Sequence, residues 1–239
     1  MTDIESGLLW SSDSPIGSTS VRAKFVQKVY SLLAVQLLAT VAIAAPFVMG
    51  DPFTVQQFIA TNLWLFYLSM AVTMGVMIAF ACVPDLMRRF PINYILLALF
   101  TAAEGVSVGI VSSMYTTSSV LVCLSLVLVV VVVLSAVAAN TKIDLTRSLW
   151  PYLLAATVVM MAAGLLLMFF PSQTGTTIYA AMGALLFSVY LVFDTQMILG
   201  GKREMQYSVD DYVPATIALY VDIISLFIYL LQLFGDRRD

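Results

Sequence analysis

Residues 118–139 read SSVLVCLSLVLVVVVVLSAVAA, an apolar run without a single charged side chain. More than about 18 consecutive apolar residues predict a transmembrane helix. The centre of the run, Val127–Leu134, consists of valine and leucine, and in water such β-branched residues favour a strand. In lipid the backbone has no partner outside its own segment, so we predict a helix here.

Six further apolar stretches of similar length occur along the chain, and short polar breaks separate them. Because a helix rises about 1.5 Å per residue, each stretch is long enough to cross about 30 Å of hydrocarbon. We therefore predict an all-α membrane protein, a bundle of seven transmembrane helices with short loops. The predicted spans are residues 29–50, 58–83, 92–113, 118–139, 149–170, 177–200 and 213–234.

The composition supports this fold class and excludes others. Of the 239 residues, 61% are hydrophobic and only 10% are charged, whereas a soluble domain has about 25% charged residues. The net charge of −3 offers no basic surface for a nucleic acid. Histidine is absent, and the two cysteines, Cys82 and Cys123, lack metal-ligand spacing. We expect no cofactor and no enzymatic activity.

The chain divides into two parts of very different composition. Residues 1–20 are polar and rich in serine and glycine, which predicts a flexible tail. Residues 21–239 contain all the apolar stretches, which predicts a single helical bundle embedded in the lipid bilayer.

The distribution of lysine and arginine predicts the orientation of the bundle. Nine basic residues fall on the N-terminal side of the membrane, and the three loops on the other side hold none, so we predict a cytosolic N-terminus. Seven crossings would place Arg237 and Arg238 on the side opposite the other basic residues, which conflicts with this orientation. Either the last segment crosses despite them, or one late segment is re-entrant. The nine residues are Arg22, Lys24, Lys28, Arg88, Arg89, Lys142, Arg147, Lys202 and Arg203.

Three carboxylic acids, Glu104, Asp194 and Asp222, lie inside predicted spans. An ionisable group at bilayer depth costs on the order of 2.5–3.5 kcal/mol, and it should face the bundle interior or water. No predicted span contains a basic side chain that could pair with them. These acids must therefore pair with one another, with polar neighbours or with cations.

The depths of the acids indicate which of them meet. Counted from the N-terminal side, Glu104 lies about 18 Å deep, Asp194 about 9 Å and Asp222 about 13 Å. Asp194 and Asp222 are on consecutive antiparallel spans joined by a short loop, so we expect their carboxyl groups to approach hydrogen-bonding distance.

Two carboxylates in a low-dielectric site cannot both ionise cheaply, so such a pair holds one proton between them. Calcium, a hard cation that prefers oxygen ligands, is able to replace that proton. We predict a proton-sensitive site at Asp194 and Asp222 that binds calcium, with Glu104 as a further acid on the ion pathway. The alternative is structural, because a lone acid in the membrane also links helices by bonding a neighbouring hydroxyl; Thr101 and Ser107 lie near Glu104.

Several segments, in their order and spacing, resemble the transmembrane Bax inhibitor motif family, Lifeguard branch. The most specific are Phe193-Asp-Thr-Gln196 and Leu219–Phe227, which contain the two aspartates. Ser225 departs from the pattern, since Lifeguard members commonly carry asparagine there. The other matching segments are Val21–Leu33, Pro91–Leu97, Phe100–Gly105, Thr141–Asp144 and Asp211–Ala215.

This resemblance implies a seven-helix bundle that leaks calcium ions from internal stores in a pH-dependent way and suppresses cell death. It implies that Asp194 and Asp222 form the pH-sensing latch and that Glu104 corresponds to the family's third-span glutamate. It also implies residence in the endoplasmic reticulum or Golgi, and cell-death regulators or other membrane proteins as partners. The arginine that some members carry in the second span has no counterpart here.

Two other functions are compatible with parts of the sequence. An intramembrane aspartyl protease also uses two acids on consecutive helices, but Leu219-Tyr-Val precedes Asp222 where those proteases have Gly-x-Gly. A non-conducting scaffold that binds other membrane proteins remains open, because the polar tail and small-residue motifs allow it.

Overall fold

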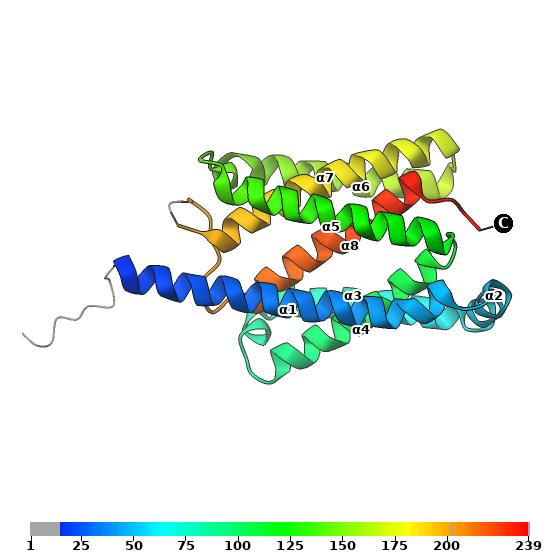
Figure 1. The fold of residues 1–239 in the computed structure, drawn as a ribbon, viewed down its shortest axis with the longest axis horizontal. Coiled ribbons are helices and arrows are strands. Elements are labelled where there is room, and N and C mark those ends of the chain that lie inside the picture. Colours follow the sequence, from blue (N-terminus) through cyan, green and yellow to red (C-terminus); the bar gives the residue numbers. More distant parts are fainter. Residues whose placement is uncertain (1–14, 202, 239) are drawn as a thin grey trace, which may run out of the picture.

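A computed structural model describes the backbone of residues 15–201 and 203–238, and side chains from residue 20 onward. Over this part of the chain the fold is entirely helical apart from one isolated bridge between Tyr115 and Arg237. This confirms the predicted fold class (Figure 1). The helices are α1 (Pro15–Met49), α2 (Pro52–Thr61), α3 (Leu63–Cys82), the 3-10 helix η2 (Pro84–Met87), α4 (Ile92–Ser112), α5 (Thr117–Asn140), α6 (Leu145–Phe169), α7 (Gln173–Leu199) and α8 (Tyr212–Phe234).

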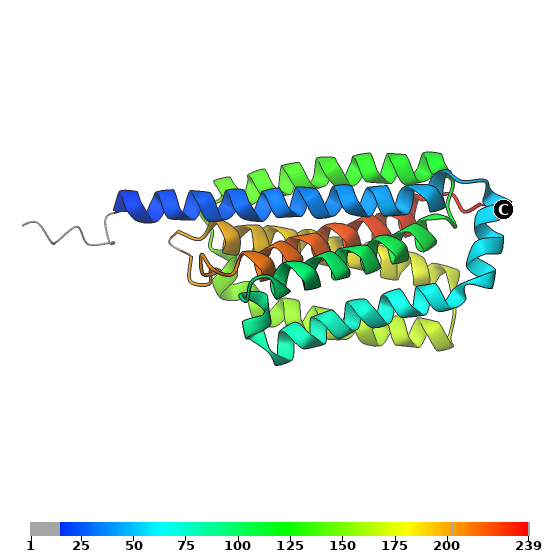
Figure 2. The same cartoon turned by 90° about the horizontal axis from the view of Figure 1, so that it is seen from below.

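Seven of these helices, all except α2 and η2, are long and apolar enough to cross a membrane. The predicted number of spans is therefore confirmed, although the second predicted span begins too early. Asn62 separates α2 from α3, and its side-chain amide donates to the carbonyl of Phe58 at the end of α2. Helix α2 runs across the end of the bundle, while α3 turns back into it (Figure 2).

The first helix begins earlier than the predicted first span. Helix α1 starts at Pro15, inside the segment predicted to be a flexible tail, and it extends beyond the other helices (Figure 1). Residues 1–14 of that predicted tail lie outside the described residues.

Helix α8 lies at the centre of the bundle, packed against α7, α1, α5 and α4. Its buried residues include Leu219, Tyr220, Leu226 and Leu231. Around it, α3 packs on α4 and α6 packs on α7. The outer faces of α5 and α6 expose valine, leucine and methionine side chains, which suits contact with acyl chains.

The structure decides between the two alternatives for the end of the chain. Helix α8 runs the full length of the bundle, and the C-terminus lies at the opposite end from the start of α1 (Figure 1). There Arg238 Nη2 donates to the Val48 carbonyl (2.6 Å) and to Thr117 Oγ1 (2.7 Å). The backbone N–H of Thr116 donates to the carbonyl of Asp236 (2.9 Å). The last helix thus spans the bundle, and Arg238 binds polar groups at the far end.

Candidate functional site

Asp194 on α7 and Asp222 on α8 line one cavity of about 450 Å³. Both are buried, with 8% and 4% of their surface exposed, and their carboxyl groups are in hydrogen-bonding contact. Two ionised carboxylates held this close would repel each other. The structure thus brings together the two acids that the sequence placed on consecutive spans.

The packing of the two helices sets the direction of these side chains. On α8, Pro214, Ala218 and Asp222 follow one another at a spacing of four residues, so they share the face that lines the cavity. On α7, Phe193 is buried and stacks against Trp150 of α6, with ring centroids 6.3 Å apart. This contact leaves the adjacent Asp194 facing α8.

The walls of the cavity are mostly apolar. The hydroxyl groups of Thr157 and Tyr190 lie 2.7 Å apart and hydrogen-bond each other. Over the described part of the chain, no lysine or arginine lines the cavity, and no N–H or hydroxyl group donates to the buried Oδ2 of Asp222. The other lining residues are Met77, Phe80, Ala81, Met87, Phe187, Pro214, Ile217, Ala218 and Val221.

The loop between α7 and α8 lies at the predicted cytosolic end of the bundle, which we call the basic end (Figure 1). Arg22 on α1 donates to the backbone carbonyls of Met197 (2.6 Å), Leu199 (3.3 Å) and Tyr207 (2.5 Å). The last carbonyls of a helix lack partners within the helix, and a guanidinium group satisfies them well. Arg22 therefore joins α1, the end of α7 and the loop.

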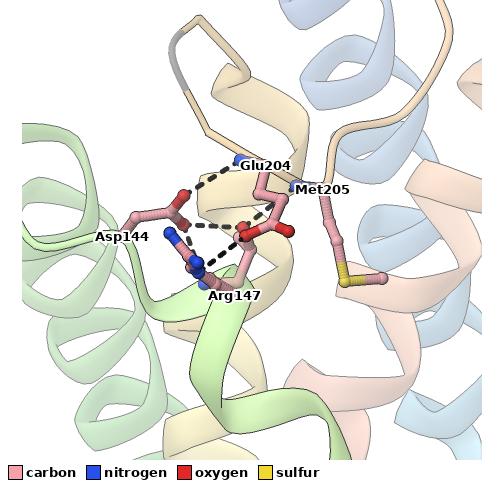
Figure 3. A network of polar contacts seen from close by, with 5 residues as sticks. Asp144, Arg147, Glu204 and Met205 are labelled. Atoms are coloured by element: carbon pink, nitrogen blue, oxygen red, sulfur yellow. Dashed lines mark hydrogen bonds and ion pairs between the residues drawn. The ribbon is translucent and has the colours of Figure 1, made fainter.

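A second network ties this loop to the start of α6 (Figure 3). Asp144 Oδ1 accepts hydrogen bonds from the backbone N–H and the hydroxyl of Thr146, and its Oδ2 accepts one from the N–H of Glu204. Arg147 forms an ion pair with Glu204 (3.1 Å), and the N–H of Met205 donates to Thr146 Oγ1. The hydrogen bonds from Thr146 and Glu204 lower the pKa of Asp144.

The loop also reaches toward the aspartates. Tyr207 is partly buried near both Asp194 and Asp222; its burial, together with the charge of those carboxyls, raises the pKa of the phenol. Arg88 forms an ion pair with Asp211 (2.7 Å), which joins the segment between α3 and α4 to the start of α8. Together these contacts fix the loop near the two aspartates.

This set of loop contacts was not predicted from the sequence. Gln196 follows Asp194 by two residues, and its side chain bonds the backbone N–H of Leu145 and the carbonyl of Ile143. Gln196 and Asp144 fall in segments that carry the family resemblance, and this was the one signal in the sequence that pointed to them.

Glu104 does not line the aspartate cavity. It is half-buried on α4, with its carboxyl next to Thr73 of α3 and near Tyr220 of α8. The residues predicted as its structural partners bond elsewhere: Thr101 accepts from Gln36 Nε2 (2.8 Å), and the Ser107 hydroxyl pairs with that of Ser69 (2.7 Å). Thr40 and Tyr220 share a further hydrogen bond (2.7 Å). We call this group the Glu104 cluster.

Residues 22–239 match the family model described as inhibitor of apoptosis-promoting Bax1. The chain belongs to this family. The predicted resemblance is thereby confirmed, and the chain is a multi-span membrane protein of the Bax1 inhibitor family. The matched region begins at Arg22, which binds the α7–α8 loop, and it includes all three membrane acids.

Individual members of the Bax1 inhibitor family cover most of the chain. Protein lifeguard 3 from Homo sapiens is 37% identical over 221 residues, which is 91% of this chain and 70% of that protein. The Mus musculus protein of the same name is 35% identical over 220 residues, with the same coverage. Protein LIFEGUARD 4 from Arabidopsis thaliana is 35% identical over 223 residues, covering 91% of this chain and 86% of that protein.

Proposed function

We propose that this protein is a pH-sensitive calcium leak channel of internal membranes that suppresses cell death, with Asp194 and Asp222 as its gate. The observation that carries the proposal is the contact between two buried carboxyl groups in a cavity that no basic side chain of the described residues lines. Membership of the Bax1 inhibitor family supports the cell-death role.

Proton binding and calcium binding compete at such a pair. With one shared proton the two acids hold α7 and α8 together, whereas loss of that proton leaves two negative charges in a low-dielectric site. The charges then repel each other and attract a divalent cation. The protonation state of the pair therefore governs both the ion affinity and the separation of the two helices.

The ligand set favours passage of calcium over storage. Calcium takes six to eight oxygen ligands, and the described residues contain no group of three or more acids or other metal-ligating side chains. Two carboxylates supply at most four oxygens, so water must complete the coordination. A weak site of this kind lets an ion enter and leave again, as conduction requires.

Glu104 has a different role in this proposal. Its cluster joins α1, α3, α4 and α8 by hydrogen bonds away from the aspartate cavity. We propose that Glu104 stabilises the packing of α4 against α3 and that the two aspartates alone form the gate.

The test is calcium efflux from proteoliposomes measured across a range of pH. We expect the wild-type flux to vary with pH and expect Asp194→Asn and Asp222→Asn to abolish that dependence. Asp210→Asn removes one negative charge from the exposed loop and serves as the matched control. Unchanged flux and an unchanged pH profile in both cavity variants would contradict the proposal.

A further inference from the structure

We propose that the cavity of Asp194 and Asp222 binds a lipophilic amine, meaning an ammonium group with one apolar tail, and that this ligand enters from the bilayer. The cavity contains the three features that such a molecule needs. It has two acid groups without a basic partner among the described residues, apolar walls around them, and an opening toward lipid.

The acid groups lack a positive partner. Asp222 is almost completely buried, and its Oδ2 receives no hydrogen bond from an N–H or hydroxyl group of the described residues. Neither ion pair found in the described chain involves Asp194 or Asp222. An ammonium group supplies both the missing donors and the missing charge, and charge-assisted hydrogen bonds are about twice as strong as neutral ones.

The walls suit an apolar tail more than a second charge. Phe80, Phe187, Ile217 and Val221 line the cavity, and its volume of about 450 Å³ lies within the range of small-molecule sites. The rings of Phe187 and Tyr190 lie side by side, with centroids 5.9 Å apart. Aromatic faces attract an ammonium group within about 6 Å, which adds to the pull of the carboxyls.

The opening faces the hydrocarbon region. Met77 and Ala81 of α3 line the cavity although both are exposed. They lie on a helix that packs against α4, while α6, on the far side of the cavity, packs against α7. Exposed apolar positions of a spanning helix contact acyl chains. At the basic end, by contrast, Arg22 fixes Tyr207 and the α7–α8 loop near the two aspartates.

An amphiphile in the bilayer therefore has a more direct route to the cavity than a solute that arrives from water at the basic end. Its ammonium group stays near the membrane surface while its tail lies in the hydrocarbon, and the sequence places Asp194 only about 9 Å from that surface. A bound ammonium group occupies the position of the shared proton or of calcium. Block of the calcium leak by the amine follows from this, and that consequence rests on the proposed function.

The test measures binding to the full chain in lipid nanodiscs by titration calorimetry, with empty nanodiscs as the blank. The probes are n-decylamine, its neutral analogue n-decanol, and propylamine, which has the charge without the long tail. We expect decylamine to bind at least about tenfold more tightly than either analogue. Equal affinity for decylamine and decanol would overturn the role of the acids, and equal affinity for decylamine and propylamine would show a site for water-soluble amines instead.

Substitutions locate the site. We expect Asp194→Asn and Asp222→Asn each to weaken decylamine binding by about tenfold or more, and expect Asp210→Asn to leave it unchanged. Ala81→Trp narrows the opening and should slow association, whereas Ala71→Trp, also exposed on α3 but outside the cavity lining, should not. Wild-type affinity in both cavity variants would refute the proposal, and the comparison of the three probes needs no variant to fold.

The binding proposal and the channel proposal fail separately. Tight binding of decylamine to a protein that conducts no calcium would refute the channel and leave the amine site intact. A pH-sensitive calcium flux that decylamine does not block, in a protein that does not bind decylamine, would refute the amine site and leave the channel intact.

Discussion

The aspartate cavity and the Glu104 cluster place acids in the membrane in two different ways. In the Glu104 cluster, side chains from neighbouring helices bond one another, as Gln36 does with Thr101 and Thr40 with Tyr220. In the aspartate cavity, two acids face each other and about 450 Å³ of open volume. An acid in a spanning helix is thus not by itself evidence of an ion pathway; the space and partners around it decide.

The largest expected difference between the two regions is in the response of calcium flux to pH. Asp222→Asn should remove the pH dependence, because one carboxyl alone has no partner with which to share a proton. Glu104→Gln should retain the dependence, because Glu104 lies outside the cavity. Proteoliposome efflux measured on both variants at several pH values tests the contrast. Loss of the pH dependence in Glu104→Gln would place Glu104 in the gate.

The next effect concerns the α7–α8 loop next to the aspartate cavity, for which the Glu104 cluster has no counterpart. Arg22→Gln removes the charged donor that holds the α7–α8 loop, so water should reach the cavity. An Ala218→Cys reporter, in a Cys82→Ser background, should react several times faster with a hydrophilic thiol reagent when Arg22 is replaced. Lys24→Gln is the control on the same helix. An equal labelling rate with and without Arg22 would show that the loop does not seal the cavity.

A smaller effect is expected from the hydrogen bonds of the Glu104 cluster. Removal of the bond between Thr40 and Tyr220, by Thr40→Val or Tyr220→Phe, should lower the free energy of unfolding by about 0.6–1.7 kcal/mol. The double variant should cost less than the sum of the two, since both remove the same bond. Unfolding in detergent micelles measures all three. Strict additivity would show that the two hydroxyls contribute independently.

The smallest effect is expected at Asp144, in the loop network at the basic end of the bundle. Its pKa is lowered in the folded protein by hydrogen bonds from Thr146 and Glu204, so its contribution to stability is present above its unfolded pKa of about 3.9. That contribution is lost as the pH falls through the lower, folded pKa. Asp144→Asn should therefore reduce the unfolding temperature slightly at pH 7 and by less at pH 3. An equal reduction at both pH values would assign the effect to lost packing.

Hydropathy was sufficient to predict the spans, because in lipid an apolar run such as residues 118–139 satisfies its backbone hydrogen bonds only as a helix. It could not predict the break at Asn62, which depends on one amide bonding the Phe58 carbonyl. The pairing of Asp194 with Asp222 was predictable from their depths and the short loop between their helices. The separation of Glu104 was not, because depth along a helix says nothing about the direction in which a side chain points.

The loop network was also beyond prediction. Arg22 and Tyr207 are 185 residues apart in the sequence, and their contact is between a side chain and a backbone carbonyl. Nearly any residue supplies such a carbonyl, so the residue types in the sequence do not indicate this contact. The positive charge of Arg22 indicated topology, and its role as a helix cap appeared only in the structure.

The central claim is that Asp194 and Asp222 share one proton inside the bundle. Infrared spectroscopy detects this directly, since a protonated carboxyl has a carbonyl stretch that an ionised one lacks. At neutral pH the wild-type protein should show such a band, and in both Asp194→Asn and Asp222→Asn the band should shift or disappear. A band that is identical in the wild type and in both variants would contradict the shared proton and, with it, the proposed gate.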